Sequence, residues 1–507
     1  MKRLYFLCVV SFFISASAFA QVVGNEWINY SQKYLKVKVL YDGIYRIDST
    51  TLSNSLNSIG VALNTIDPRN FQLFHNGQEE YIYMKGDSDG VFNSADFLEF
   101  YGQHNDGAKD SVLYTGGNTI LNPYYSLYND TAVYFLTWNS STTNRRFSVP
   151  NDTAFSLYTP SPYFIDEETF IGNSEYFPGV QTSLGITDPA FISSEGFYDL
   201  PFDYGSTAAR NVYSANAYTG SGTPWATLRM KIGSHSDDFN LSGPDNEVKI
   251  EIFNQQLTDT LYNGYQVNNY SYNVPPSSLG PSYTTFNISS INPGNASISS
   301  GRTAIAYILL DYAHTFNLEG RTRFFGYLPD DTAQAKSLLT MTSVGGSGIV
   351  RVYDFYHHQR IDAVNFGFAQ KALVANGNGT KKPFVVVDET SVRQVTTLTP
   401  VNASGQFVDF SLQAADSAFV IVTHRSLMGV GIEYKNYRSS AAGGMRNVVL
   451  ADISELYDQF AYGIGKDPLA IRNFADYMIR NYPTPPRHLL LIGKSIYPDY
   501  ARGHILP

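Results

Sequence analysis

Short runs in which apolar and polar residues alternate recur along most of this 507-residue chain. Residues 34–39, 226–232 and 248–252 each carry an apolar side chain at nearly every second position. Successive side chains of a β-strand point to opposite faces, so this period of two indicates strands with one buried face. Tyr and Phe are abundant (38 and 33 residues) and suit a half-buried pleated surface. We therefore predict a mainly β chain.

The predicted strands fall into groups, and a chain of this length is expected to form about three domains. Turn-rich and Pro/Gly-rich stretches suggest the boundaries. The spacing of the strands favours β-sandwich or jelly-roll modules, and no repeat of fixed period indicates a solenoid or a propeller. The predicted regions are an N-terminal β domain (21–150), an irregular linker (151–205), a β-sandwich (206–325) and a further β-rich module (326–410).

Two dipeptides predict tight hairpins in the N-terminal domain. Asp42-Gly43 follows the alternating run 34–39, and Asn76-Gly77 follows the run 71–74. Asp-Gly and Asn-Gly favour the two-residue turns that join antiparallel neighbours. Each dipeptide is therefore expected to connect two strands that pair with each other.

The pattern changes after about residue 411. The apolar runs 419–422, 448–450 and 489–492 do not alternate, as strands covered on both faces require. Helical patterns separate them, and strand–helix alternation predicts crossovers onto a parallel sheet. We therefore predict that residues 411–507 begin an α/β domain.

The helix before the third run has clear boundary signals. Asp467 can cap it, and Pro468 suits its first position because the missing N–H costs nothing there. Apolar residues then recur three and four positions apart and predict one buried face. The residues of this predicted face are Ile471, Phe474, Ala475 and Met478.

The N-terminus has the layout of a cleavable signal peptide. Two basic residues precede the apolar run 4–14, and Ala18 and Ala20 supply small side chains before the cleavage point. The apolar run is shorter than the roughly 20 residues that a membrane-spanning helix needs. We predict a signal peptide over 1–20 and an exported protein, in the periplasm, at the outer-membrane surface or secreted. No transmembrane segment is expected after its removal.

Removal of the signal peptide changes both charge and cysteine content. The segment carries two positive charges and no negative ones, so the formal net charge goes from −10 to −12. The only cysteine of the chain, Cys8, also lies within it. The mature chain therefore has neither a disulfide nor a thiol, and its acidic balance argues against a nucleic-acid partner.

Several motifs resemble the gingipain-type cysteine peptidase domain, over 416–495. Residues 453–463 are similar to an Ile-Tyr…Phe-x-x-Gly pattern of that family, and 467–474 to its Asp-x-x-Ala-Ile-Arg-x-Phe helix. Residues 489–493 resemble its Leu-Leu-x-Gly-Asp strand end. Upstream, 96–102 resembles the Asp-x-x-x-Phe-Tyr-Gly signature of type IX secretion sortases. The resemblance implies a caspase-like parallel sheet for the C-terminal domain.

The same resemblance shows which catalytic groups are missing. In this family a His and a Cys after later strands form a dyad, in which the thiolate attacks and the imidazole handles the proton. His424 and His488 precede the family's catalytic position, His504 has no partner, and Lys494 stands where the family has an acidic residue. We therefore predict no catalytic residue in the mature chain, expect it not to cleave peptides, and expect the dyad beyond Pro507.

The resemblance implies a sortase-like transpeptidase of the type IX secretion pathway, with exported protein substrates and outer-membrane secretion components as partners. One alternative is a non-catalytic exported β-sandwich scaffold or adhesin with a degenerate gingipain-like end, which the missing cysteine favours. A second is a secreted endopeptidase. A sheet of three parallel strands that stopped at Pro507 would expose an apolar edge, which favours the peptidase hypothesis.

A loop of the N-terminal domain has the spacing of a calcium site. Its oxygen ligands would occupy positions 3, 5, 9 and 12, with a glycine at position 6. Position 1 would be Lys85, a cation where a carboxylate belongs, so a polar turn before the strand 97–100 is the alternative reading. The candidate calcium ligands are Asp87, Asp89, Asn93 and Asp96. No other cofactor is predicted.

Overall fold

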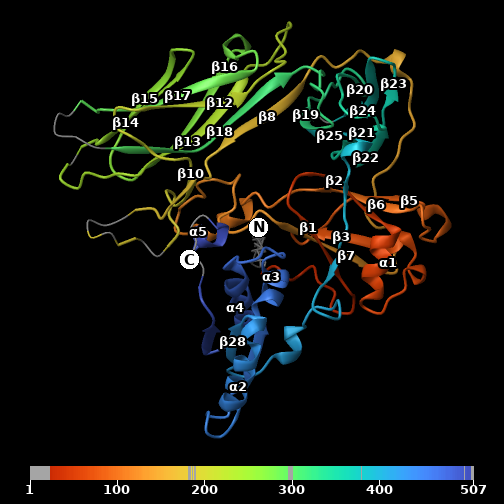
Figure 1. The fold of residues 1–507 in the computed structure, drawn as a ribbon, viewed down its shortest axis with the longest axis vertical. Helices are drawn as coiled ribbons and strands as arrows, with labels where there is room; N and C mark the ends of the chain where they lie inside the picture. The colour runs from red at the N-terminus through yellow and green to blue at the C-terminus, as the bar shows by residue number, and fades with distance from the viewer. Residues whose placement is uncertain are drawn as a thin grey trace, which may run out of the picture.

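The computed structural model shows two β regions above an α/β domain that holds the C-terminal part of the chain (Figure 1). Among the described residues most of the regular structure is β-strand, and the only sheet made entirely of parallel strands lies in the α/β domain. The predicted fold class is therefore confirmed. The predicted signal peptide and Cys8 lie outside the described residues. The structure describes residues 23–180, 184, 186–187, 190–241, 243–294, 301–377, 379–495 and 497–503.

Two sheets pack face to face in the N-terminal domain. Its elements are β1 (Leu35–Val39), β2 (Gly43–Asp48), α1 (Ser49–Asn57), β3 (Phe71–His75), β4 (Gln78–Glu79), β5 (Ile82–Lys85), β6 (Phe97–Gly102), β7 (Ala132–Trp138), β26 (Arg393–Gln394) and β27 (Thr399–Pro400). One sheet has the order β27-β1-β7-β3-β4 and the other β26-β2-β6-β5. Apolar side chains of both sheets, among them Leu73, Phe100 and Leu136, form the core. The short strands β26 and β27 lie more than 250 residues after the other strands of these sheets in the sequence.

The two predicted hairpins have different outcomes. Asn76-Gly77 joins β3 to β4, with His75 opposite Gln78 and positive φ angles of 50° and 79°, as a primed turn requires. That prediction is confirmed. The Asp42-Gly43 prediction is wrong because β1 pairs with β7 and β27, whereas β2 pairs with β6 and β26. At this dipeptide the chain crosses from one sheet to the other.

A nine-stranded sheet forms the upper layer of the molecule in Figure 1. Its strands are β8 (Phe164–Ile171), β11 (Phe202–Asp203), β13 (Ala226–Ser234), β16 (Val267–Val274), β18 (Arg302–His314), β19 (Arg323–Leu328), β21 (Val350–Asp354), β22 (Gln359–Asp362) and β25 (Lys382–Asp388). The order is β16-β13-β18-β8-β19-β25-β21-β22, with β11 paired to β18. β8 lies in the predicted irregular linker, which therefore contains a central strand. Three consecutive acidic residues, 166–168, break the apolar alternation that would have revealed it.

Two smaller sheets cover the two halves of this large sheet. The first contains β12 (Thr207–Tyr213), β14 (Asn246–Ile252), β15 (Gln255–Tyr262) and β17 (Tyr283–Ile291), and the second β20 (Lys336–Thr342), β23 (Val364–Asn365) and β24 (Ala369–Ala375). Leu228, Ile250 and Ile308 belong to the core of the first sandwich, and Leu339 and Val352 to that of the second. A separate two-stranded ribbon pairs β9 (Glu175–Phe177) with β10 (Gly196–Tyr198).

The second sandwich rests on the N-terminal domain. Side chains of β21 and β25 that point away from its own core, including Tyr353 and Val385, pack against Ile44 of β2 and Phe147. The β2–β6 sheet is therefore covered on both faces. This arrangement stacks four β layers and removes the polar face that an outer sheet would present to water.

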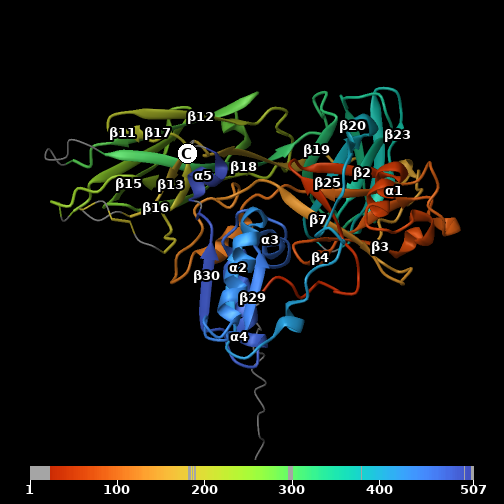
Figure 2. The ribbon, with the colours of Figure 1, turned by 60° about the horizontal axis from the view of Figure 1, so that its bottom comes forward.

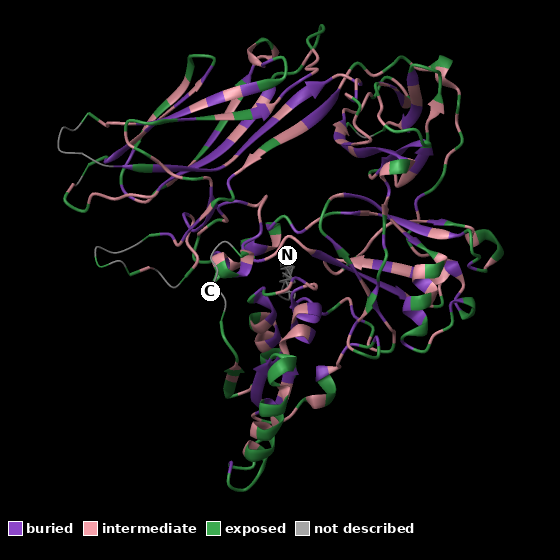
Figure 3. Ribbon diagram, viewed as in Figure 1, coloured by how far each residue is buried: buried purple, intermediate pink, exposed green. Residues whose placement is uncertain are grey.

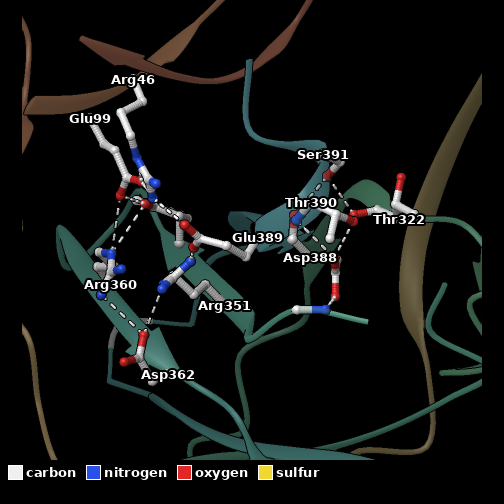
Figure 4. Close-up of polar contacts among 12 residues, drawn as sticks. Arg46, Glu99, Thr322, Arg351, Arg360, Asp362, Asp388, Glu389, Thr390 and Ser391 are labelled. Carbon is white, nitrogen blue, oxygen red and sulfur yellow. Dashed lines mark hydrogen bonds and ion pairs between the residues drawn. The ribbon is translucent and has the colours of Figure 1, made fainter. Parts of the chain in front are cut away.

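A buried cluster of charged residues crosses this interface (Figure 4). Glu99 on β6 is fully buried and accepts hydrogen bonds from Arg46 on β2, from the Tyr353 hydroxyl at 2.8 Å and from Arg360 at 3.4 Å. Arg360 also donates to Asp362 at 3.0 Å. Tyr353 and Arg360 belong to the second sandwich and Glu99 and Arg46 to the N-terminal domain, so this cluster links the two through paired buried ions.

The C-terminal part forms a three-layer α/β domain. It contains β28 (Phe419–Thr423), α2 (Met428–Ser439), β29 (Val448–Asp452), α3 (Ile453–Phe460), α4 (Leu469–Asn481), β30 (His488–Ile492) and α5 (Pro498–Arg502). The strands are parallel in the order β29-β28-β30, and all five residues of β28 are buried. α3 and α4 cover one face of the sheet, while α2 packs on the other and remains mostly exposed (Figure 3). β30 forms one edge of the domain (Figure 2).

The observed start and buried face of α4 differ slightly from the prediction. The helix begins at Leu469, one residue later than predicted, so Pro468 rather than Asp467 stands at the N-cap. The Asp467 carboxylate still accepts a hydrogen bond from the Leu469 N–H at 2.8 Å. Phe474 and Met478 are buried, as predicted, together with Ala470. The predicted face residues Ile471 and Ala475 are only half-buried, because the helix is turned so that the row beginning at Ala470 meets the sheet.

Candidate active-site edge of the parallel sheet

The carboxyl ends of the three parallel strands meet at one edge of the α/β domain. Thr423 at the end of β28 lies in register with Asp452 of β29 and Ile492 of β30. The Thr423 hydroxyl donates to the Ile492 carbonyl at 3.0 Å, which ties two strand ends together. Ligands of open parallel sheets bind outside the carboxyl ends of the strands, so this edge is the candidate site.

His424 is the first residue beyond β28 at this edge. Its Nδ1 accepts a hydrogen bond from the Ser426 N–H at 3.2 Å and lies 2.8 Å from the Ser426 hydroxyl. This contact caps a short 3₁₀ turn, Arg425–Leu427, and in the neutral ring it leaves the proton on Nε2, which faces away from the cap. The exposed imidazole is thus oriented at the edge.

His488 lies at the opposite edge of the same sheet. It begins β30, pairs in register with Phe419, and its ring centre lies 5.4 Å from the Phe419 ring. Five residues of strand separate that level from His424, or about 16 Å at roughly 3.3 Å per residue. The two histidines therefore cannot act in one site. His504 and Cys8 lie outside the described residues, which contain no cysteine.

The edge opens into a pocket of about 270 Å³ between the α/β domain and the N-terminal domain. The Lys36 ammonium of β1 lies 2.6 Å from the Asp458 carboxylate of α3 within it. Burial raises the pKa of Asp458, and Lys36 opposes that rise. The lining residues are Lys36, Thr399, Pro400, Asn402, Ala403, Arg425, Ser454, Glu455 and Asp458. The pocket lining therefore offers both signs of charge and two hydroxyl groups, but no thiol.

Replacing Lys36 by alanine is expected to lower the free energy of unfolding by about 2 kcal/mol near pH 8, because Asp458 would be left buried without its counter-charge. The loss should be smaller near pH 5. Without the lysine the pKa of folded Asp458 rises further, so the folded state gains stability by protonation as the pH falls. Urea unfolding at both pH values measures this, with the exposed Lys38→Ala on the same strand as control. Equal losses at both pH values would contradict the assignment.

Two further carboxylates are buried where the α/β domain meets the loop before β7. Asp110 accepts a hydrogen bond from the Leu127 N–H at 2.7 Å, and burial raises its pKa to about 6. Burial, reinforced by the charge of Asp110, raises the pKa of Asp467 to about 7. Nearby, Arg502 of α5 pairs with Asp130 through two bonds of 2.6 and 2.9 Å. The contact between the α/β domain and the N-terminal domain thus contains a two-bond ion pair and two buried carboxyl groups whose protonation depends on pH.

Stability is expected to fall between about pH 4 and pH 7 because of these two groups, whose pKa values rise from 3.8 to about 6 and about 7 on folding. A carboxyl with a raised pKa in the folded state stabilises the fold when protonated, and this contribution is lost as the pH rises through the folded-state value. Asp110→Asn or Asp467→Asn should flatten the profile and raise stability at pH 8 by about 2 kcal/mol. Thermal unfolding across this pH range is the measurement, with exposed Asp416→Asn as control. An unchanged profile in both variants would refute it.

The residues of the predicted calcium loop form a hydrogen-bonded turn before β6. Asp96 accepts a bond from the Asn93 N–H at 2.6 Å, and Asp89 accepts bonds from the Val91 N–H and the Asn93 amide. Asp87 and Asp89 lie in the preceding 3₁₀ turn, Asp87–Asp89. Within the described ranges no group of three or more His, Cys, Asp or Glu side chains is placed to hold a metal ion. Calcium binding by Asp87, Asp89, Asn93 and Asp96 stays a prediction.

Comparison with known proteins identifies the α/β domain. Residues 413–507 match the model of peptidase family C25. The α/β domain therefore resembles this family, the gingipains. A search of curated proteins returned no match. The predicted family resemblance is therefore confirmed for the domain that contains the candidate edge. In the part of the chain that the structure describes, no helix is long and apolar enough to cross a membrane.

Solved structures extend the likeness to the β layers in front of the C25 domain. Dimeric latent PorU from Porphyromonas gingivalis is 12% identical, with a TM-score of 0.55 over 92% of this chain and 42% of that one. The two thus share a fold, and this chain spans 42% of the length of its relative. A CBM36-1 domain of a multidomain xylanase from the hindgut metagenome of Trinervitermes trinervoides is 13% identical over 29% of this chain and 95% of that one, with a TM-score of 0.17. That score is too low to support an argument.

Proposed function

We propose that this chain is part of a gingipain-type cysteine peptidase of the type IX secretion pathway, acting as a sortase-like transpeptidase on exported cargo proteins. The C25 match over 413–507 carries the proposal, and the shared fold with latent PorU supports it. In the proposed reaction a thiolate attacks the scissile carbonyl and an imidazole transfers the proton to the leaving amine. The resulting acyl-enzyme would pass its acyl group to a second amine or to water.

The residues of this chain would support that chemistry. In the proposed enzyme the sheet β29-β28-β30 holds the carboxyl edge, and the core around Phe474 and Met478 keeps it rigid. The N-terminal domain forms the far wall of the pocket through Lys36 and Asn402. The β layers would thereby position a cargo segment against the edge, with outer-membrane secretion components as further partners. The predicted signal peptide over 1–20 supports an exported location.

Because Cys8 is the only cysteine in this sequence, the dyad is assigned to a further part of the family domain. The first test is the nucleotide sequence after the Pro507 codon. An open frame that encodes strand-like runs followed by a His and then a Cys supports the proposal. A stop codon at that point would refute it and leave the scaffold or adhesin alternative, which the absence of a thiol from residues 21–507 favours.

Activity provides the second test. The present chain is expected to leave a cargo protein with a C-terminal sorting signal uncut, whereas the product of the longer frame should remove the signal. The longer product with its cysteine replaced by alanine is the matched control. Mass spectrometry of the cargo then separates the remaining alternatives, because a transpeptidase joins the new C-terminus to an added amine and a plain endopeptidase leaves a free carboxylate.

A further inference from the structure

A second hollow, of about 490 Å³, lies where the second sandwich meets the N-terminal domain. Its wall is unusually basic. Arg323 comes from β19 and Arg393 from β26, and both guanidinium groups approach Gly43 of β2. A Cβ atom at Gly43 would lie 2.8 Å from Arg323 Nη1 and 3.4 Å from Arg393 Nε, so the two cations share a confined space. The lining residues are Gly320, Arg321, Thr322, Arg323, Ser391 and Arg393.

Two of the three arginines in this hollow lack a counter-charge. Arg321 pairs with Glu319 at 3.2 Å and with Glu168 at 3.5 Å. Among the described residues, by contrast, neither Arg323 nor Arg393 has a carboxylate oxygen within 4.0 Å. The Nε atom of Arg393 is buried and makes no hydrogen bond. The guanidinium as a whole is half-buried and lies 5.1 Å from the centre of the Tyr41 ring. A buried N–H donor without a hydrogen-bond partner is costly, which points to an acceptor that the hollow receives.

The neighbouring groups do not remove this excess of positive charge. Asp42 is the carboxylate whose charge acts on the pKa of Arg323. Its Oδ1, however, accepts hydrogen bonds from the His104 backbone N–H at 2.8 Å and from the His104 ring at 2.7 Å. Burial, and then the charge of Arg393, lower the pKa of Arg323. The two guanidinium groups therefore repel each other across the hollow.

The backbone holds both arginines in place. Arg323 pairs with Val387 in the β19–β25 ladder, and Arg393 with Tyr45 in the β26–β2 ladder. The Ser391 hydroxyl donates to the Thr322 carbonyl at 2.9 Å and joins the two strand starts (Figure 4). Because strand pairing fixes the two backbone positions, both half-buried side chains start from fixed points at the rim of the same hollow.

We propose that this hollow binds a doubly charged oxyanion, a phosphate group, between Arg323 and Arg393. A guanidinium presents paired N–H donors that match the spacing of phosphate oxygens. A dianion neutralises both cations, whereas a carboxylate neutralises only one. The group can be inorganic phosphate or the phosphate of a phosphorylated sugar, since the chemistry at the arginines is the same. This proposal stands apart from the peptidase assignment.

The test compares the chain with its Arg323→Gln and Arg393→Gln variants, with and without inorganic phosphate at pH 8. Phosphate at about ten times its Kd should raise the Tm of the original chain by about 2–4 °C. Either variant should lose most of this shift, and calorimetric titration should show phosphate affinity weakened about tenfold or more. Without phosphate each variant should be at least as stable as the original, because one of two repelling charges is gone.

Matched samples exclude a general salt effect. Sodium chloride at equal ionic strength and the exposed Arg302→Gln variant serve as controls. Equal phosphate shifts in the original chain and both variants, or no heat on titration, would overturn the proposal. Titration with glucose 6-phosphate separates the two sources. Tighter binding than inorganic phosphate indicates a phosphorylated sugar, and weaker binding indicates the free ion. Binding should weaken near pH 6, where the phosphate group gains a proton.

Discussion

Replacing Glu99 by glutamine is expected to lower the free energy of unfolding by about 3–5 kcal/mol, the usual cost of removing one partner from a buried ion pair. Glu99 is fully buried and compensates Arg46 and Arg360 from two different domains. Glutamine keeps the shape of the side chain and removes its charge. Arg360, which is only 3% exposed, would retain Asp362 as its single ionic partner.

Urea unfolding of the full chain measures this effect. Two spectroscopic probes monitor the unfolding, one in the N-terminal domain and one in the second sandwich. The variant should separate two transitions that coincide in the original chain, because the charges that couple the domains no longer balance. Glu80→Gln is the matched control, since Glu80 is half-exposed and its carboxylate lies 3.7 Å from Nδ1 of His75. A Glu99 variant as stable as the control would show that the cluster does not hold the interface.

Truncation of Phe474 to alanine should cost about 3–5 kcal/mol in the C25 domain, the range for emptying an aromatic site in a packed core. The ring is fully buried between the helices and the sheet, with ring centres of Phe410 at 4.7 Å and Phe460 at 5.2 Å. Residues on both sides of α4 are fixed in strands or helices, so the cavity cannot collapse fully.

Hydrogen exchange read by mass spectrometry tests this prediction locally. Peptides from β28 and α4 should lose protection in Phe474→Ala, while peptides from the first sandwich should remain unchanged. Ile479→Ala is the control on the same helix, because Ile479 is 54% exposed and should cost less than about 0.5 kcal/mol. Equal protection in the two variants would mean that α4 does not carry the core of this domain.

Local pattern was sufficient for most strands and for the parallel sheet. The alternation in 226–232 and 248–252 corresponds to β13 and β14, and the unbroken run 419–422 to the fully buried β28. Alternation indicates a strand that is covered on one face, and an unbroken apolar run indicates a strand that is covered on both faces, so both patterns can be recognised in the sequence alone. The family motifs likewise fell on the α/β domain that the C25 model matches.

Strand partners and the charged cluster could not be obtained in the same way. The run before Asp42-Gly43 is a strand, but alternation does not say that it pairs with β7 rather than with the next segment. Glu99 stands between Leu98 and Phe100, where an ordinary amphipathic strand puts a solvent-facing residue. It is buried because a second domain covers that face. A charged residue in the middle of a strongly apolar strand was the available signal.

The candidate site was predictable in its position but not in its surroundings. The strand ends that follow the apolar runs indicate where His424 and Asp452 lie, since parallel strands bring their carboxyl ends together. The pairing of Lys36 with Asp458 and the buried pair Asp110 and Asp467 join segments hundreds of residues apart. No local pattern encodes such contacts.

Strands β26 and β27 are synthesised long after the other strands of the two sheets that they complete. Leu35 pairs with Pro400 and Tyr45 with Arg393. The two N-terminal sheets are therefore incomplete until the ribosome has synthesised residue 400. At typical rates of elongation that delay is roughly 20–70 s. Two strand edges stay open throughout it, and open edges invite pairing with other chains. The nascent N-terminal domain is therefore open to such pairing for longer than its own length would suggest.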